Sequence, residues 1–191
     1  KISKVKKNIF DVDVATIRFA GDSGDGMQLT GNQFSDNTAI VGNDLATMPD
    51  FPAEIRAPKG SLAGVSSFQI QFSSKDVHTP GDDLDVLVAM NPAGLKVHLN
   101  DLKDNGMLLI NSTNFTPKNL KLAGYDENPL DNDSLDSYQL IKVDMTKLVT
   151  TALKDSGLPS KLMARSTNMF ALGLLYWLYE RFRCPRCNHP I

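Results

Sequence analysis

The sequence predicts an α/β domain built on a doubly wound, mostly parallel sheet with helices on both faces. Short apolar runs typical of buried strands alternate along the chain with segments of helical spacing. A turn with three glycines separates the first such run from the first helix, and the run 85–90 has the continuous apolar character of a strand covered on both faces. With 191 residues, 41% of them hydrophobic, the chain is long enough for one generous domain.

The first half of the chain starts with an expected strand over 15–20. After the glycine turn, apolar and small residues at steps of four and three predict a helix from Met27 to Val41, which Gly42 ends. We expect a short buried strand over 45–48 and then a long loop rich in proline and glycine. Apolar residues recur across 65–72 as in a further strand.

The second half alternates strands and helices more regularly. Asn91 followed by Pro92 is a good N-cap with proline at the first helical position, so we expect a helix that keeps Leu102 on its buried side and that Gly106 closes. A buried strand is expected over 107–110, and the polar stretch 113–137 reads as an irregular surface excursion.

Two helices are expected to end the domain. A strand over 138–143 leads to Asp144, which caps a helix that stops at Gly157. The final helix is expected from Lys161 to Arg181, and it is apolar nearly all round between 169 and 177. Such a helix is buried in a core or in a subunit interface.

Charge and composition limit the classes of partner. The net charge of −2 gives no basis for a nucleic-acid partner, and the longest apolar run is too short to span a bilayer. The two cysteines, three positions apart near the end, form no disulfide framework. We therefore expect a cytoplasmic protein with a basic leader over 1–12, a domain over 13–181 and an atypical cysteine-containing tail over 182–191.

The glycine turn is the main candidate binding site. Glycines permit close backbone approach, and the first N–H groups of the following helix have no partners within the helix, so the turn can bind an anion such as phosphate. The two aspartates would oppose this unless they point outward or cap backbone N–H groups. A tight turn that binds nothing is the alternative. The candidate residues are Gly21, Asp22, Ser23, Gly24, Asp25 and Gly26.

Several familiar motifs do not fit this turn. Its glycine order, G-x-x-G-x-G, differs from the dinucleotide pattern, and no Lys-Ser/Thr ending of a triphosphate loop follows. The stretch Gly-Asp-Ser-Gly resembles a serine-protease nucleophile, but all three histidines follow Ser23, which is the wrong chain order. A calcium loop fails because Gln33 stands where a bidentate glutamate is needed.

Other polar residues carry weaker hypotheses. Glu54, Arg56 and Lys59 project from the proline-stiffened loop, which is either a solvated connection or a loop that reaches a partner or substrate. His78 and His98 have no catalytic or metal partners in the pattern and are expected to be structural, so no catalytic residue is assigned. Three further residues have the spacing of half a zinc ribbon, without a second pair of ligands, so no metal site is assigned to them and a metal shared between two chains is the alternative: Cys184, Cys187 and His189.

Three segments of the chain together resemble one protein family. These are Phe19–Gly26, Pro52–Pro58 and Ser166–Gly173, and over about 13–180 the chain is similar to the γ domain that begins the α chain of 2-oxoacid:ferredoxin oxidoreductases of the 2-oxoglutarate type. The resemblance implies a complete enzyme that decarboxylates a 2-oxoacid oxidatively to an acyl-CoA, with electrons passing to ferredoxin. After residue 182 the chain departs from the family pattern, and a fragment, a truncated gene product and a short variant with an altered tail stay open.

The resemblance also implies how the work is divided. Thiamine diphosphate, Mg²⁺ and an iron–sulfur cluster belong to the α and β partner parts, and the γ domain helps to bind coenzyme A and packs on those parts. The turn Gly21–Gly26 is then the site for the CoA phosphates, and the loop carrying Glu54, Arg56 and Lys59 faces the catalytic core. The chain alone is expected to be inactive, and homo-oligomerisation stays open.

Two alternatives of other classes remain. In the first alternative, the chain is a free-standing nucleotide-binding module, and Asp50 near the end of the second strand is the ribose partner of a dinucleotide. In the second it is a structural assembly domain whose turn binds nothing. Binding of NAD without any response to CoA would favour the first alternative, and association without any ligand effect would favour the second.

Overall fold

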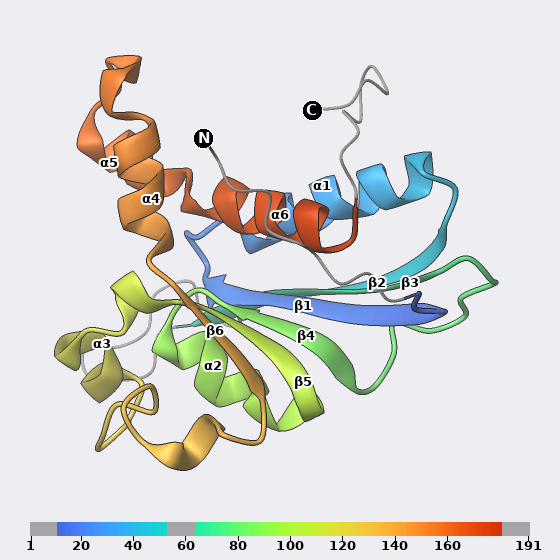
Figure 1. Ribbon diagram of the computed structural model, residues 1–191, viewed down its shortest axis with the longest axis horizontal. Coiled ribbons are helices and arrows are strands. Elements are labelled where there is room, and N and C mark those ends of the chain that lie inside the picture. Colours follow the sequence, from blue (N-terminus) through green and yellow to red (C-terminus); the bar gives the residue numbers. More distant parts are fainter. Residues whose placement is uncertain (1–10, 53–63, 181–191) are drawn as a thin grey trace.

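The computed structural model describes residues 11–52 and 64–180, which form one mixed sheet with helices on both faces (Figure 1). In chain order the elements are β1 (Val14–Asp22), α1 (Met27–Ile40), β2 (Asp44–Asp50), β3 (Val65–Ser73), β4 (Leu84–Ala89), α2 (Pro92–His98), η1 (Leu99–Asp101), β5 (Leu102–Asn111), η2 (Ser112–Asn114), α3 (Pro117–Leu122), η3 (Asp133–Leu135), β6 (Gln139–Val143), α4 (Met145–Ala152), η4 (Lys154–Ser156), α5 (Ser160–Arg165) and α6 (Thr167–Leu178).

The six strands of the described residues lie in the order β2-β3-β1-β4-β5-β6. The pairs β1–β4, β4–β5 and β5–β6 are parallel, whereas β3 runs antiparallel to both β1 and β2. The predicted α/β class with helices on both faces is therefore confirmed, with β3 as the one reversed strand of the described sheet. Because β2 runs parallel to β1, the end of β2 and the start of β3 lie at the same edge of the sheet as the turn after β1.

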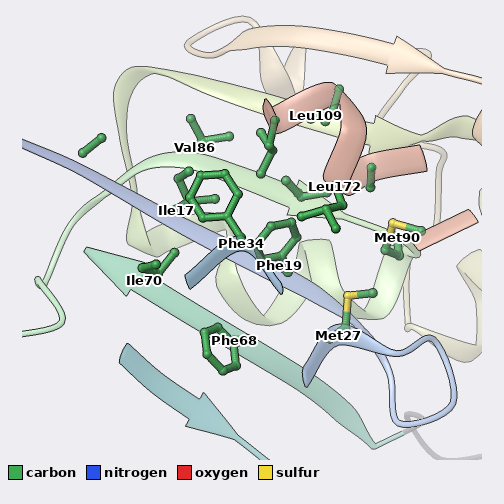
Figure 2. Packing of buried hydrophobic residues seen from close by; sticks show 14 of the residues in the cluster. Ile17, Phe19, Met27, Phe34, Phe68, Ile70, Val86, Met90, Leu109 and Leu172 are labelled. Atoms are coloured by element: carbon green, nitrogen blue, oxygen red, sulfur yellow. The ribbon is translucent and has the colours of Figure 1, made fainter. Parts of the chain in front are cut away.

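Two apolar cores lie on opposite faces of the sheet. Helices α1 and α6 cover one face, where Phe34 is fully buried and its ring contacts those of Phe19, Phe72, Tyr176 and Tyr179. Figure 2 shows this core, with Met27 at the start of α1 beside the glycine turn. Helices α2 and α3 pack on the other face; in Figure 1 α2 lies below the strands and α3 lies at the left end of the sheet.

The expected buried strand over 45–48 is an edge strand instead. Leu45 and Ala46 of β2 are half-buried, and Thr47 and Met48 are exposed. An apolar run of four residues does not reveal whether a neighbour covers each face, so edge and centre positions look alike in sequence.

Helix α2 is shorter than expected. It ends at His98, a 3₁₀ turn follows, and Leu102 already begins β5. Gly106 lies within β5, and the left-handed residue beside it is Asn105, with φ of 59°. Leu102 is buried as predicted, but from a strand. Asparagine is the non-glycine residue that best tolerates this conformation, so the glycine beside it was a misleading stop signal.

The stretch 113–137 is not a plain surface excursion. It holds α3 and two short 3₁₀ turns, and it sends apolar side chains into the second core: Phe115, Leu120, Leu130 and Leu135. The predominance of Asp and Asn concealed these widely spaced apolar residues.

The final helix is divided in two. Helix α5 ends at Arg165, and α6 begins at Thr167 after the irregular residue Ser166. The apolar stretch between 169 and 177 buries one face of α6, including Ala171 and Leu172, and leaves Met169 and Trp177 38% and 47% exposed.

Candidate functional site

The glycine turn lies at the carboxyl edge of the parallel strands. Strand β1 ends at Asp22 and α1 begins at Met27, so four residues reverse the chain. Ser23 and Gly24 are exposed at its tip. Ligands of open α/β sheets bind beyond this edge, and a helix N-terminus there favours negative charge.

Both aspartates of the turn are held by hydrogen bonds inside the protein. The Asp22 backbone N–H donates to Asp25 Oδ2 at 3.0 Å, and the Asp25 N–H donates to the Asp22 carbonyl at 2.9 Å. Asn91 Nδ2 donates to Asp22 Oδ1 at 2.6 Å. The Asp25 carboxylate therefore closes the turn by capping a backbone N–H group, and the Asp22 carboxylate ties the turn to the start of α2.

Burial raises the pKa of both carboxyl groups. For Asp22 the hydrogen bond from Asn91 opposes the rise. For Asp25 the backbone hydrogen bond from Asp22 opposes it, and the neighbouring Asp22 charge adds to it. The raised pKa values mean that burial in the turn disfavours the charged form of both carboxyl groups.

The three glycines of the turn differ in why the fold needs them. A Cβ at Gly21 would lie 2.8 Å from Asp25 Oδ2 and 3.1 Å from Met90 Cβ. Gly26 has φ of 75°, and a Cβ there would lie 2.4 Å from Asn168 Nδ2. Gly24 has neither constraint, because nothing lies within 4 Å of its Cβ position. The fold explains Gly21 and Gly26 but leaves Gly24 free for a ligand's approach.

The first turn of α1 lacks a side-chain cap. Its N-cap is Gly26, no side chain accepts from the first amides, and the first turn holds no acidic residue. Helix N-termini without such a cap expose several N–H donors toward whatever lies beyond them. The arrangement can therefore bind a phosphate or a carboxylate.

Two asparagines complete the site, and the sequence alone did not assign them to it. Asn91 caps α2 as predicted, its Oδ1 accepting from the Gly94 N–H at 2.8 Å, but its bond to Asp22 was not foreseen. Asn168, in the third family-like segment, is far from Gly26 in the sequence, but its Nδ2 lies against Gly26 in the structure. The position of Asn91 directly after a parallel strand was the only signal that could have linked it to the turn.

The predicted proline-rich loop after the second strand lies only partly within the described residues. Glu54, Arg56 and Lys59 lie outside the described residues, as do Cys184, Cys187 and His189. The two strands that flank the loop lie close to α1, because Gln28 Nε2 donates to the Asp50 carbonyl of β2 at 3.0 Å and to the Ser67 carbonyl of β3 at 2.9 Å.

The sheet order weakens the dinucleotide alternative. In a dinucleotide-binding βαβ unit the strands on either side of the first helix are parallel neighbours. Here the antiparallel β3 lies between β1 and β2, so Asp50 is separated from the glycine turn by a whole strand.

The histidines lie apart from the turn. His78 is exposed, whereas His98, the last residue of α2, is buried and its Nδ1 accepts from Arg18 Nη1 at 2.9 Å. Arg18 is itself buried and also bonds Gln69 and Asp101. Burial, and then the charge of Arg18, lower the pKa of His98. This polar cluster fastens α2 to the centre of the sheet.

The described residues offer neither a metal centre nor a membrane span. Within 11–52 and 64–180, no three His, Cys, Asp or Glu side chains converge as metal ligands would. In the same ranges no helix has the length and apolar character needed to cross a bilayer. A cavity of about 790 Å³ lies at the opposite edge of the sheet, near the starts of β1, β4 and β5, and none of residues 21–26 lines it.

Comparison with solved structures supports the fold. The chain is similar, at 24% identity and a TM-score of 0.64, to a 2-oxoglutarate:ferredoxin oxidoreductase from Magnetococcus marinus solved with 2-oxoglutarate, coenzyme A and succinyl-CoA bound, covering 87% of this chain and 24% of that one. A keto/oxoacid ferredoxin oxidoreductase γ subunit from Geobacter sulfurreducens matches at 21% identity and a TM-score of 0.58, covering 87% of this chain and 78% of that one.

Sequence comparison is more specific. The chain is 56% identical over 165 residues to the 2-oxoglutarate oxidoreductase subunit KorA of Mycobacterium tuberculosis (strain ATCC 25618 / H37Rv), covering 86% of this chain and 25% of that protein. It thus spans about a quarter of this curated relative. The family model described as pyruvate ferredoxin/flavodoxin oxidoreductase matches residues 16–182. The chain therefore belongs to the pyruvate ferredoxin/flavodoxin oxidoreductase family.

Proposed function

We propose that this chain is the γ part of a 2-oxoacid:ferredoxin oxidoreductase, with 2-oxoglutarate as substrate of the whole enzyme, and that its glycine turn binds the phosphates of coenzyme A. The observation that carries the proposal is the uncapped start of α1 beside Gly24, whose Cβ position is open. The 56% identity to KorA and the CoA-bound Magnetococcus marinus relative supply the substrate class.

The residues of this chain fit coenzyme A better than they fit the other cofactors of the family. Backbone amides at the start of α1 suit phosphate oxygens. An iron–sulfur cluster is held by cysteine thiolates, usually four, and the chain has two cysteines, both near its end. We therefore assign thiamine diphosphate, Mg²⁺ and the cluster to partner parts, and assign this chain, over 13–181, to CoA binding and packing.

Exposed apolar side chains support the packing role. Helices α4, α5 and α6 contact one another and, with the turn between α4 and α5, carry large apolar residues more than a third exposed: Leu148, Leu158, Leu162, Met169 and Trp177. An isolated domain gains nothing from exposing them, and a covering partner would bury them. The rest of the oxidoreductase is the proposed partner, with ferredoxin as the acceptor of the complete enzyme.

Thermal unfolding with CoA, NAD and inorganic phosphate tests the site. A ligand at about 100 times its dissociation constant stabilises a protein by about 2.7 kcal/mol. We expect a rise in melting temperature with CoA that Gly24→Val abolishes, and a smaller loss with Gly24→Ala. Because the Gly24 Cβ position is open, both variants should melt near the wild-type temperature without ligand.

The outcomes separate the alternatives. A shift with NAD and none with CoA would favour a free-standing nucleotide-binding module. No shift with any ligand, together with self-association, would favour a structural assembly domain. For the packing role, the chain alone should form no acyl-CoA from 2-oxoglutarate, and adding the partner parts should restore turnover. Turnover by the chain alone would contradict this division of labour.

A further inference from the structure

Helices α4 and α5, with the 3₁₀ turn η4 between them, form a hairpin over residues 145–165, which we name the α4–α5 hairpin. Figure 1 shows it projecting from one end of the molecule. Met145 and Val149 of α4 are buried, whereas η4 and α5 bury no residue of their own. The main contacts of α5 are with α4 and α6. The hairpin is therefore attached to the domain chiefly through one face of α4.

Helix α5 has few sources of stability within this chain. It runs for six residues, Ser160–Arg165, and no side chain of the described residues caps its start. Isolated helices shorter than about 12 residues are marginal in water, and helices in proteins gain most of their stability by packing a buried face. In α5, Met163 and Ala164 are half-buried and the other residues are exposed. Such a helix is expected where a second molecule completes the packing.

Large apolar side chains lie on the outside of the hairpin. Leu148 on α4 is 47% exposed, and Leu158 in the turn and Leu162 on α5 are each 44% exposed. One exposed leucine on a protein surface needs no explanation, but three on one short hairpin indicate an interaction surface.

The same hairpin carries an excess of positive charge. Asp155 is its one acidic residue, although the whole chain has a net charge of −2. Four exposed cations accompany it: Lys147, Lys154, Lys161 and Arg165. Within 11–52 and 64–180, none of these four side chains forms an ion pair. Like charges on one projecting element repel one another, and an acidic surface placed against them would relieve that repulsion.

The mixture of leucines and cations narrows the class of partner. The hairpin contains no aromatic residue that could stack on a base, and its leucines would find no apolar contact along a phosphate backbone. Its helices, of eight and six residues, are much shorter than the helices of about 20–30 residues that often lie on membranes. An apolar centre with a charged rim is instead typical of a protein interface, where charges of opposite sign face each other.

We propose that the α4–α5 hairpin docks on an acidic surface of the partner parts of the oxidoreductase, with its leucines against apolar residues and its cations paired with carboxylates. The inference rests on the proposed function, because it names the surface through which the γ part packs and the chemistry of the surface that receives it. Charges at the rim of an interface chiefly speed association, whereas most other contacts act by slowing dissociation. The cations and the leucines therefore have separable effects.

Surface plasmon resonance with the 191-residue chain and the purified partner parts tests this proposal. Association of the wild-type chain should slow as the ionic strength rises from about 0.1 M to about 1 M, because the Debye length falls from about 10 Å to about 3 Å. Lys154→Glu combined with Lys161→Glu should slow association about tenfold or more at the lower ionic strength and weaken its salt dependence. Leu158→Ser should instead speed dissociation and leave the association rate constant unchanged.

A matched control is available on α3, which packs on the other face of the sheet. Lys118 and Lys121 are exposed there, so Lys118→Glu combined with Lys121→Glu makes the same change of net charge away from the hairpin. It should leave both rate constants unchanged. All substituted side chains are exposed, so circular dichroism should show the wild-type fold and melting temperature. Lys154→Gln combined with Lys161→Gln, which only neutralises the charges, decides the question if the glutamate variant does not fold.

The outcomes separate this inference from the proposed function. A wild-type chain that does not bind the partner parts would overturn the packing role together with the inference. Binding that survives charge reversal on the hairpin, or that the α3 control weakens equally, would overturn the inference alone. Self-association of the wild-type chain in analytical ultracentrifugation, abolished by the hairpin substitutions, would assign the surface to a second copy and would likewise overturn it.

Discussion

Gly31 lies where α1 packs on Phe68 of β3 without room for a Cβ, and replacing it with alanine should loosen the domain. A Cβ at this position would lie 2.1 Å from both Cγ and Cδ1 of Phe68 and 2.8 Å from its Cβ. Phe68 is 2% exposed in the middle of β3. Turning its ring cannot relieve the contact at its Cβ, so the helix itself must move outward.

Two opposing effects set the size of the change. Alanine stabilises a helix interior by about 1 kcal/mol relative to glycine. Overpacking a core costs about 1–3 kcal/mol, and contacts at 2.1 Å in a fully buried setting belong at the upper end. The net expectation is a loss of about 2 kcal/mol, which lowers the melting temperature of a chain of this length by about 4–8 °C.

Urea unfolding followed by circular dichroism measures this difference. Gly173→Ala in α6 is the matched control, since nothing lies within 4 Å of its Cβ position. It should stabilise the domain by about 0.5–1 kcal/mol through helix propensity alone. A Gly31→Ala variant as stable as the wild-type chain would refute the reasoning, because it would mean that α1 does not pack as closely on β3 as described.

Two further predictions concern charge. Burial, and then the charge of Arg18, lower the pKa of His98 in the folded chain, so the unfolded chain binds a proton there more readily. The free energy of unfolding should therefore fall as the pH drops below about 6.5, the pKa of an unfolded histidine. His98→Gln should flatten this part of a stability–pH profile. An unchanged profile would argue against the buried His98–Arg18 contact. Asp25→Asn keeps an oxygen for the Asp22 N–H but removes a carboxylate whose pKa burial raises, so CoA should bind about threefold to tenfold tighter in a titration at neutral pH and low salt. Weaker binding in this variant would mean that the Asp25 charge is needed by the site.

Much of the fold followed from local patterns. The apolar run 85–90 became β4, the helical spacing after Met27 became α1, and the Asn91-Pro92 pair capped α2 as predicted. These features depend on side-chain periodicity and capping, which act within a few residues. The predictions that were wrong concern features set by residues distant in the chain. Whether β2 is at an edge, where α2 stops and how the apolar residues of 113–137 are used depend on neighbours distant in the chain.

By itself, the sequence determined the α/β class, the turn between β1 and α1, and a family resemblance that comparison then confirmed. Only the tertiary structure decided that β3 separates β1 from β2, that Asn91 holds Asp22, and that Asn168 lies over the start of α1. The physical reason is that strands, caps and turns arise from interactions between near neighbours along the chain. The candidate site instead depends on contacts between residues about 70 and 140 positions apart, which the packing of helices on the sheet brings together.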